Sequence, residues 1–583
     1  MGIAPPSNAV AVLGSMPLFA EVPDEELLAL AAGAHWCELP GGATLFREGD
    51  PADAAYVVAS GRLEASSGDT VVRVIGEGEV TGEAGLLEAG SRSATVAAVR
   101  DSVLARIDSS DLERLATRHP GVALGLARSV AARLRVDPSV SRRLRPPCLV
   151  AAVAVADDVD LSAFVAALVA ACPTDTTAVV VDGSAGTDTV ARAIELEVGA
   201  DLVVIVVSPD DVEWVCRQAD LVVMVGRVGS RPSRTASSLG AVTRPAQLLL
   251  TRRPGAAPTT RGWDSLADGV AANSPVVHVE DGSSADLARF GRCLTGRSVG
   301  VVLGGGGARG FAHIGVLRAL AEAGVTIDRV GGSSMGSIIG AQLALGWSAE
   351  RMLEENSSRW SRRMLAEVRW PSVSLASGER ASALFRAIFG DRRIEELLLD
   401  YFCTTADLTA SRLHIADRGP VADWVGASSA VPGLWPPSAD SQGHLHSDGG
   451  ILDNVPTAVM RSRSAGPVIA VDVCSQQAPM LVVPASGHAA LAPLRRRRGT
   501  GADGGDAPSM LELLNRSNLL ASVQSWQTAR AHADLYLTPS TGTHGFASFD
   551  RVSELADLGY SSTLRQLTDV DLDGLGQAPR SHT

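Results

Sequence analysis

A serine flanked by glycines between a strand and a helix is the feature that most limits how this chain can fold. It lies in Gly332-Ser333-Ser334-Met335-Gly336. The preceding residues, GVTIDRVGG, have the pattern of a strand, and the following SIIGAQLALG that of a helix. The two glycines are expected to let the backbone turn sharply and push the serine hydroxyl out at the end of a sheet strand. The motif therefore predicts an α/β fold with Ser334 as a candidate nucleophile.

Two more motifs accompany this serine. Upstream, GGGGARG at residues 304–310 follows the apolar strand SVGVVL and opens the helical stretch FAHIGVLRALAEAG. Glycines there allow backbone N–H groups to converge beside a helix N-terminus, which can stabilise a developing oxyanion. Downstream, Asp448 follows the strand-like HLH and precedes Gly449 and Gly450. A nucleophile, a donor loop and a carboxylate together indicate an acyl-transfer site.

The predicted chemistry requires the fold to bring the serine and a base together. A serine hydroxyl is a weak nucleophile until a base within hydrogen-bond distance accepts its proton. Asp448 can be that base if its site is partly dry and correctly placed. A Ser–His–Asp triad is the alternative, because His446 lies two residues before Asp448 on the same face of the expected strand. The other candidate histidines are His313, His414 and His444.

Each motif alone has a simpler interpretation. Gly305-x-Gly307-x-x-Gly310 also fits a dinucleotide-binding fingerprint, which needs an acidic residue at the end of the following strand. Asp328 instead precedes that strand, and the serine turn occupies its end. A lone G-x-S-x-G arises easily by chance in a chain with 59 glycines. The three motifs in this order are poorly explained by chance.

The three motifs resemble those of the patatin-like phospholipases, G-G-G-x-R/K-G, G-x-S-x-G and D-G-A/G. This resemblance implies a Ser–Asp dyad without a histidine, in which Ser334 is the nucleophile and Asp448 is the base. It also implies an oxyanion site formed by Gly305, Gly306, Gly307 and Arg309. The remaining motif positions are Gly310, Gly332, Gly336, Gly449 and Gly450.

The similarity extends to the neuropathy target esterase family, through DLARFGRCLTGRSVGVVLGGGGARGFAHIGVLRALAEAGVTIDRVGGSSMGS and through ADLVVMVG at residues 219–226. Members of that family hydrolyse lysophospholipids and phospholipids and carry cyclic-nucleotide-binding domains before the patatin domain. The resemblance implies a serine ester hydrolase of lysophospholipids or phospholipids that requires no cofactor. A neutral-lipid or short-acyl esterase is the alternative enzyme. The alternative from another class is a nucleotide-binding regulatory protein with an idle patatin domain.

Residues 1–140 predict a β-barrel or jelly roll, with a short helix and strands such as AAYVVASGRLEA separated by glycine turns. Within it, GEAGLL at residues 82–87 and RSAT at residues 92–95 resemble the phosphate-binding cassette of cyclic-nucleotide-binding domains. The resemblance implies that Glu83 binds the ribose 2′-hydroxyl of cAMP or cGMP and that Arg92 binds the cyclic phosphate, with Gly82 and Ser93 beside them. The alternative is a ligand-free barrel.

Residues 146–290 alternate apolar strands with helices and predict a Rossmann-like α/β middle domain with buried parallel strands. The region has no dinucleotide fingerprint and no Walker lysine, so we predict only a spacer or coupling role. Residues 298–583 form the third predicted domain, a patatin-like α/β/α hydrolase with its catalytic core at about 299–465. The chain is therefore expected to be multidomain.

Composition argues against several function classes. The net charge of −14 disfavours a nucleic-acid-binding protein. All 51 basic residues are arginines, which excludes a Walker A lysine, a Schiff-base lysine and a Ser–Lys dyad. Seven scattered cysteines without C-x-x-C spacing predict reduced thiols in the cytoplasm and no cysteine metal site. No metal is expected.

Contact with lipid is expected to be peripheral. No apolar run reaches the roughly 18 residues of a membrane-spanning helix, and the start of the chain does not have the pattern of a signal peptide. We therefore expect a cytoplasmic protein that contacts the inner membrane face. The apolar loop ASSAVPGLWPP at residues 427–437 is expected to line an acyl pocket. The arginine run at residues 495–498 either attracts anionic headgroups or is a solvated loop.

Overall fold

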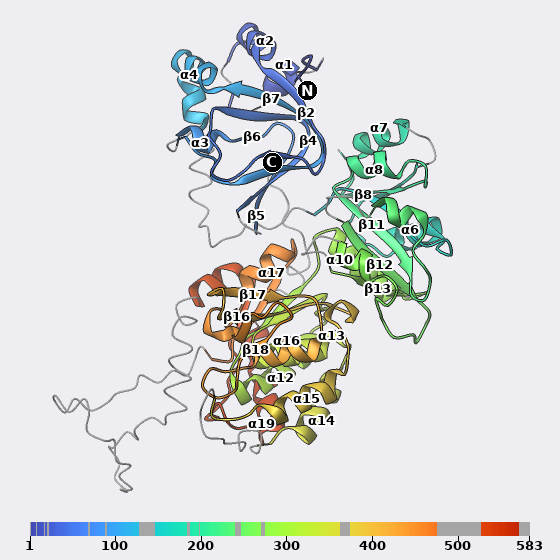
Figure 1. Ribbon diagram of the computed structural model, residues 1–583, viewed down its shortest axis with the longest axis vertical. Coiled ribbons are helices and arrows are strands. Elements are labelled where there is room, and N and C mark those ends of the chain that lie inside the picture. Colours follow the sequence, from blue (N-terminus) through green and yellow to red (C-terminus); the bar gives the residue numbers. More distant parts are fainter. Residues whose placement is uncertain are drawn as a thin grey trace, which may run out of the picture. The chain divides into compact units, whose positions relative to one another are not determined.

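Three sheets organise the described part of the chain in the computed structural model (Figure 1). The structure describes residues 2–6, 9–14, 16, 18–19, 22–67, 70–87, 90–126, 146–183, 187–197, 199–239, 246–269, 275–361, 374–474, 526–568 and 570. One compact unit consists mainly of residues 1–298 and holds two of the sheets. The other unit, Val299–Met460 with Pro467–Gln577, holds the third sheet and all three glycine motifs.

The N-terminal sheet is antiparallel throughout, in the order β1-β2-β7-β4-β5, with β3 on β7 and β6 on β4. Neighbouring residues of its long strands enter two different cores, since Val57 of β4 packs into one and Val58 into the other. The elements are β1 Gly2–Ile3, α1 Ala9–Gly14, α2 Asp24–Gly33, β2 His35–Leu39, β3 Thr44–Phe46, β4 Ala54–Ser67, β5 Thr70–Ile75, β6 Val80–Thr81, α3 Glu83–Leu87, β7 Thr95–Asp108 and α4 Ser109–Arg118. The predicted strand-rich first domain is confirmed.

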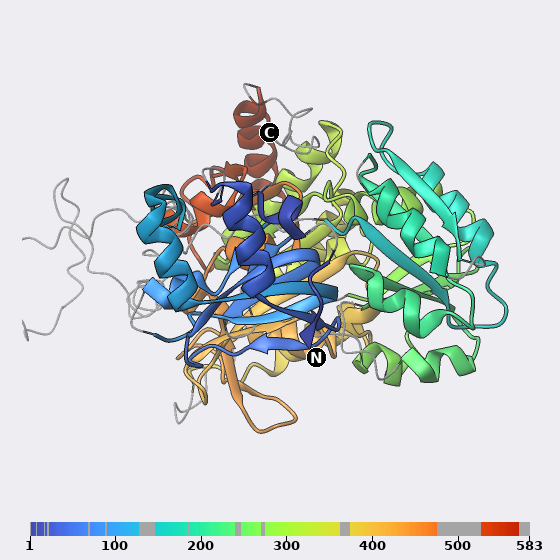
Figure 2. The same cartoon turned by 90° about the horizontal axis from the view of Figure 1, so that it is seen from above.

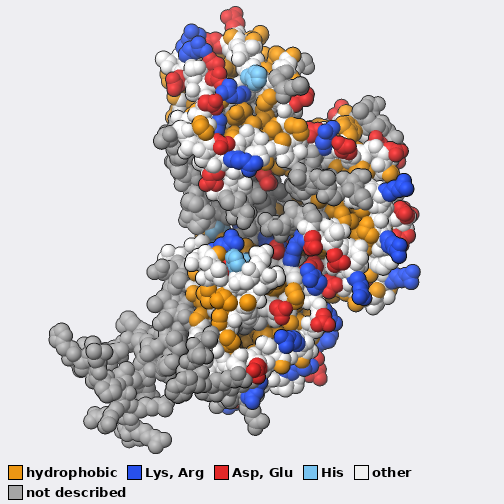
Figure 3. Space-filling model, in the orientation of Figure 1, with side chains coloured by type: hydrophobic (Ala, Val, Ile, Leu, Met, Phe, Trp, Pro, Cys, Tyr) orange, Lys and Arg blue, Asp and Glu red, His pale blue; other side chains and the backbone are white. Residues whose placement is uncertain are grey.

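The middle sheet has six parallel strands in the order β13-β12-β11-β8-β10-β9, with helices on both faces (Figures 1 and 2). Its elements are β8 Leu149–Ala154, α6 Leu161–Ala170, β9 Ala178–Asp182, α7 Thr187–Leu196, β10 Leu202–Val206, α8 Val212–Gln218, β11 Leu221–Arg227, α9 Arg234–Leu239, β12 Ala246–Arg252, α10 Asp264–Gly269, β13 Val277–Glu280 and α11 Ser284–Leu294. Acidic and basic side chains are interspersed over the visible face of this region (Figure 3). The alternating apolar strands and helices thus form the parallel sheet that their pattern predicts.

The C-terminal sheet has the order β18-β19-β16-β15-β14-β20-β21, with β17 also paired to β16. Its elements begin with β14 Gly300–Leu303, η2 Gly307–Phe311, α12 Ala312–Glu322, β15 Arg329–Gly332, α13 Met335–Ala344, α14 Ala349–Arg359, α15 Glu379–Phe389 and η4 Ile394–Glu396. They continue with β16 Asp400–Asp407, β17 Arg412–Ala416, α16 Val421–Ser428, β18 Ser438–Ala439, β19 Leu445–Asp448, η5 Gly449–Ile451, α17 Thr457–Arg463, β20 Val468–Val471, β21 Leu535–Leu537 and α19 Val552–Leu567.

Alternation along the central strands of this sheet creates two cores. On β14, Val301 and Leu303 pack into the larger core, while Val302 points to the opposite face. The larger core includes residues of α12, α13, α15, α16 and α19. The smaller core joins Val302 to Val459 and Met460 of α17. The result is the predicted three-layered α/β/α arrangement.

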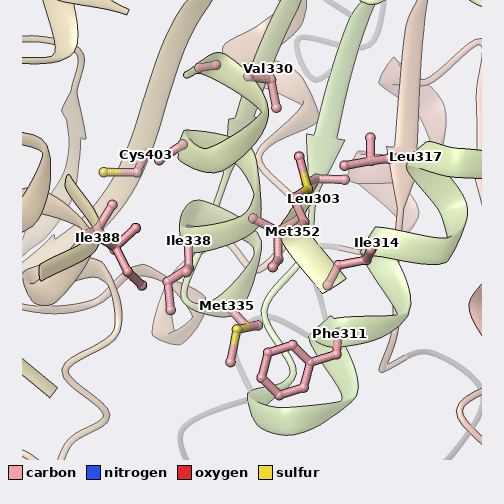
Figure 4. Packing of buried hydrophobic residues seen from close by; sticks show 14 of the residues in the cluster. Leu303, Phe311, Ile314, Leu317, Val330, Met335, Ile338, Met352, Ile388 and Cys403 are labelled. Atoms are coloured by element: carbon pink, nitrogen blue, oxygen red, sulfur yellow. The ribbon is translucent and has the colours of Figure 1, made fainter. Parts of the chain in front are cut away.

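The larger core surrounds the helix that follows the serine turn (Figure 4). Met335, at the first turn of α13, lies near the ring of Phe311, and Ile338 faces Ile388 of α15 (Figure 4). All four side chains are almost completely buried. Burial of this kind is the main stabilising term for a domain, so the serine turn rests on a rigid base.

Pairing along β16 explains how two distant motifs meet. Strand β17 occupies one edge of β16 between Cys403 and Asp407. The other edge is shared by β15, which pairs in parallel up to Cys403, and β19, which pairs antiparallel from Thr405. The two strands therefore approach each other end to end along the same neighbour. At the facing ends, the serine turn follows β15 and Asp448 is the last residue of β19.

Candidate active site

Ser334 occupies a strained turn between β15 and α13. Its φ is 53° and its ψ is −124°, in the region that L-residues rarely adopt. Neither Gly332 nor Gly336 has a positive φ, so their role is not the conformational freedom that the motif suggested. A Cβ atom at Gly336 would lie 1.9 Å from the Leu303 carbonyl oxygen, and one at Gly332 would lie 2.7 Å from the same atom. Glycine is required here because the end of β14 passes so close to the turn.

Hydrogen bonds hold the turn in this conformation. The Ser334 N–H donates to Ser428 Oγ at 3.0 Å, and the Ser428 hydroxyl donates in turn to the Thr404 carbonyl at 2.8 Å. The Ser337 hydroxyl donates to the Ser334 carbonyl at 2.6 Å. Ser428 ends α16, far from the turn in sequence; it lies in the segment 427–437, but nothing in that segment indicated a contact with the serine turn. These partners offset the cost of the strained backbone.

Asp448 is the hydrogen-bond acceptor of the serine hydroxyl. Ser334 Oγ donates to Asp448 Oδ2 at 2.6 Å, and the Gly450 N–H donates to the other carboxylate oxygen at 2.8 Å. Burial raises the pKa of Asp448 to about 6, although both hydrogen bonds act in the opposite direction. Such a carboxylate is ionised at neutral pH and is more basic than an ordinary aspartate. The structure thus brings together the serine and the carboxylate that the motifs singled out.

No histidine contacts this pair among the described residues. His446 is buried, with Nδ1 3.0 Å from Thr405 Oγ1 and Nε2 3.2 Å from Asp440 Oδ2. His444 pairs with Asp407, and the ring of His414 stacks on Trp424. His313 donates elsewhere, to the glycine loop. All four candidate histidines therefore have partners other than Ser334 and Asp448, which favours the dyad over the triad.

The first peptide of the glycine loop is held on both sides. The Gly304 carbonyl accepts from His313 Nε2 at 2.7 Å, and the Gly305 N–H donates to Asn454 Oδ1 at 3.1 Å. Complete burial lowers the pKa of His313 to about 4, so the ring is neutral and must carry its proton on Nε2. Because its N–H is already paired, Gly305 holds the loop in place instead of offering a free donor.

The next two peptides, Gly305–Gly306 and Gly306–Gly307, are held through hydrogen bonds to their carbonyl oxygens. The Gly305 carbonyl accepts from Asn454 Nδ2 at 3.2 Å and from Cys474 Sγ at 3.2 Å. The Gly306 carbonyl accepts from Arg309 Nε at 3.3 Å. In a trans peptide the N–H points opposite to the C=O. The N–H groups of Gly306 and Gly307 therefore point away from the side chains that contact the Gly305 and Gly306 carbonyls. Among the described residues neither N–H has a hydrogen-bond partner.

The thiol of Cys474 links two of these contacts. Arg309 Nη2 lies 3.5 Å from its sulfur, and burial raises the pKa of Cys474 to about 11. The side chain is therefore a protonated thiol that can donate to the Gly305 carbonyl. Arg309 contacts the loop carbonyl and this sulfur, so it orients the loop. The sequence motifs indicated Arg309 but gave no signal for Cys474.

The pocket at the serine is lined by both polar and apolar groups. Ser334, Asp448 and Asn454 line it together with the two loop glycines Gly305 and Gly306 and with Gly450. Its apolar lining consists of Val431, Pro432, Ile451 and Phe546. Val431 and Pro432 belong to the loop predicted to line an acyl pocket. Phe546 comes from the C-terminal part of the chain, and sequence reasoning missed it.

The cassette in the first domain is also partly described. Glu83 opens the short helix α3 and is buried, and Ser93 is exposed. Arg92 is buried, with Nη1 2.8 Å from the Ala54 carbonyl and 2.9 Å from the Gly82 carbonyl. Its guanidinium lies 4.2 Å above the ring of Phe46. Its Nε–H is buried and has no partner among the described residues.

The described residues contain no cluster of His, Cys, Asp and Glu side chains suited to a metal ion. None of the helices in the described part of the chain is both long and apolar enough to cross a membrane. All seven cysteines are free thiols. The arginine run at 495–498 lies outside the described residues.

Two domain families match the chain. The model of patatin-like phospholipases matches residues 301–461, which include Ser334, Asp448 and the glycine loop. The cyclic-nucleotide-binding domain matches residues 36–119, which include Glu83 and Arg92. Both matches confirm the fold classes predicted for the first and last domains.

Curated proteins are similar over nearly the whole chain. An uncharacterized NTE family protein of Mycobacterium tuberculosis is 31% identical over 576 residues, covering 95% of both chains. The human patatin-like phospholipase domain-containing protein 6 is 29% identical over 602 residues, which are 90% of this chain and 44% of the human protein. Lysophospholipase NTE1 of Mycosarcoma maydis is 28% identical, over 94% of this chain and 34% of that protein. This chain belongs to the NTE family, with a patatin-like phospholipase domain and a cyclic-nucleotide-binding domain.

Proposed function

We propose that this chain hydrolyses ester bonds of lysophospholipids or phospholipids through a Ser334–Asp448 dyad. The observation that carries the proposal is the 2.6 Å hydrogen bond from Ser334 Oγ to Asp448 Oδ2. It occurs at a strained turn, in a pocket whose other walls suit a hydrocarbon chain. The family match supports a lipid hydrolase, and the similarity to a fungal lysophospholipase supports a lysophospholipid substrate.

The first step forms a tetrahedral intermediate on Ser334. Ser334 Oγ bonds to the ester carbonyl carbon while its proton passes to Asp448 Oδ2, and the carbonyl electron pair moves to oxygen. We assign the N–H groups of Gly306 and Gly307 as donors to that oxyanion, because their peptides are turned by contacts on the carbonyl side. Asp448 is suited to accept the proton because its pKa of about 6 lies near neutral pH.

The following steps release the products. The tetrahedral intermediate collapses to an acyl-serine, the bond to the alcohol oxygen breaks, and Asp448 returns its proton to that oxygen. Water then attacks the acyl-serine by the same route, with Asp448 accepting the proton of the water. Breakage of the acyl–Oγ bond releases the fatty acid, and Ser334 regains its proton.

Turnover of a lipid panel by purified protein tests this proposal. We expect hydrolysis of lysophospholipids or phospholipids, and a fluorophosphonate probe should label Ser334 alone. Ser334→Ala should lower turnover by on the order of 10⁴-fold or more and abolish labelling. Labelling of another serine would refute the assignment. Turnover of only triacylglycerols or short esters would favour the alternative esterase, and neither turnover nor labelling would favour the idle domain.

We also propose that the first domain binds cAMP or cGMP. The family match supports this ligand class, and Arg92 keeps a buried Nε–H that could donate to a cyclic phosphate. Two of its other donors already serve backbone carbonyls, so the phosphate would meet an arginine fixed in place.

Because phospholipids assemble into bilayers, we propose that hydrolysis takes place at a membrane surface, which co-sedimentation with phospholipid vesicles tests.

A further inference from the structure

We propose that Asn454 is a positioning residue that sets the direction of the oxyanion donors. This inference rests on the proposed hydrolase function. Asn454 is buried and pairs with Gly305 twice through its amide: Oδ1 accepts from the Gly305 N–H, and Nδ2 donates to the Gly305 carbonyl. The fixed polarity of the two backbone groups also fixes which way the amide faces.

The paired contacts control a peptide that would otherwise be free to rotate. Glycines 305 and 306 have no side chains to restrict the peptide between them. If that peptide turned over, its carbonyl would face the pocket and the Gly306 N–H would face away. Asn454 opposes this rotation because its Nδ2 bond to the Gly305 carbonyl would break, while its Oδ1 holds the N–H of the preceding peptide in place. The Asn454 backbone carbonyl adds a third contact, since it accepts from the Gly305 N–H at 3.3 Å.

Asn454 also links the donor loop to the base. It follows Asp448 by six residues, in the segment that begins with the Gly450 contact to the carboxylate. A Cβ atom at Gly450 would lie 2.9 Å from Asn454 Oδ1 and 3.1 Å from Asp448 Oδ1. The absence of a side chain at position 450 therefore lets the amide and the carboxylate approach the same point. The segment 448–454 therefore positions both the base Asp448 and the glycine loop.

Other side chains share the loop, so the expected effect is large but incomplete. Cys474 and Arg309 hold the neighbouring carbonyls, and His313 holds Gly304. Loss of one oxyanion donor typically lowers kcat by about 10²–10³-fold. We expect Asn454→Leu, which has a similar volume and no polar atoms, to lower kcat by roughly 10²-fold. KM should change little, because the contact acts on the transition state.

The experiment compares variants of the full chain with one chromogenic ester and one reversible tetrahedral mimic, an alkyl trifluoromethyl ketone. For Asn454→Leu, affinity for the ketone should fall by about the same factor as kcat/KM. Affinity for a non-hydrolysable ether lipid should stay within about twofold of wild type, since this ligand has no oxyanion. Rates are normalised to the fraction of protein that a fluorophosphonate labels to completion.

A matched control is Asn356→Leu, which removes another buried amide of the same domain. Asn356 bonds to Gln342 and Trp360, away from the pocket, so this variant should lose thermal stability but keep kcat per labelled site. If Asn454→Leu does not fold, Asn454→Ala replaces it, because it removes the same two side-chain contacts, adds no charge and cannot crowd its neighbours.

The outcomes separate the inference from the function on which it rests. Equal kcat per site in wild type and both Asn454 variants would overturn the positioning role while Ser334→Ala remains inactive. A similar fall in ketone and ether-lipid affinity would also overturn it, because it would indicate a general loss of the pocket. Full activity of Ser334→Ala would instead overturn the proposed hydrolase function itself.

Discussion

At the residue scale, the site depends on polar groups whose partners lie on other elements. Ser334 takes its strained conformation because Ser428 accepts its N–H and Asp448 accepts its hydroxyl. Burial makes Asp448 a stronger base than an exposed aspartate. Neutral His313 serves the loop instead of the nucleophile. Each of these roles depends on a contact of hydrogen-bond length.

The pH dependence of turnover should report the ionisation of Asp448. The carboxylate must be deprotonated to accept the serine proton, and its pKa is about 6. Hydrolysis of an uncharged ester should therefore rise with pH through about 6 and level off above it, with a tenfold change per pH unit on the acid side. A profile of kcat from about pH 4.5 to 8.5 checks this. A midpoint that disappears in His446→Ala would instead assign the titration to that histidine.

At the element scale, two helices approach each other closely at glycines that no turn requires. Helix α12 packs against α19 so tightly that a Cβ atom at Gly315 would lie 1.8 Å from the Ala556 carbonyl oxygen. A Cβ atom at Gly559 would lie 2.2 Å from the Ala312 carbonyl oxygen. Both contacts involve backbone, which cannot move aside as a flexible side chain can. The crossing therefore depends on glycine at both positions.

Gly315→Ala should consequently destabilise the C-terminal unit by about 3 kcal/mol or more, since the helices must separate. The matched control is Gly33→Ala on α2, where a Cβ atom meets nothing within 4 Å. That change should leave stability within about 1 kcal/mol of wild type or raise it, because alanine favours helix over glycine. Thermal unfolding followed by circular dichroism measures both. Equal stability of the two variants would contradict the tight crossing.

Much of the fold could be predicted from sequence, because apolar periodicity specifies which segments are strands and which are helices. Ser334 and Asp448 were recognised because their motifs are contiguous in sequence. Ser428, Asn454, Cys474 and Phe546 were missed, because each reaches the site only through long-range packing. The role of Gly332 and Gly336 was misassigned, since the position of the β14 end cannot be read from the turn itself.

At the scale of the whole molecule, the proposed nucleotide binding and the proposed hydrolysis belong to different units. The cassette lies in the unit formed mainly by residues 1–298, and the dyad lies in the other. The predicted boundaries at 1–140, 146–290 and 298–583 remain predictions. A nucleotide can alter turnover only if it binds two arrangements of the molecule with different affinities. Binding and regulation are therefore separate claims.

Calorimetric titration of the full chain with cAMP and cGMP tests the binding claim. We expect a saturable heat for one of them and a loss of roughly 2–5 kcal/mol in Arg92→Gln, which removes the charge proposed to bind the phosphate. Glu83→Gln should cost less, because a hydroxyl contact is neutral on one side. Circular dichroism checks that both variants fold. No heat at millimolar nucleotide would identify a ligand-free barrel.

The most direct test of the central claim is the turnover of Asp448→Asn and His446→Ala on one lysophospholipid, per milligram of folded protein. Asparagine cannot accept the serine proton, so Asp448→Asn should lower kcat by on the order of 10⁴-fold. His446 contacts Thr405 and Asp440 instead of the nucleophile, so His446→Ala should keep kcat within about tenfold of wild type. Equal damage by the two substitutions would contradict the dyad and require a histidine in the mechanism.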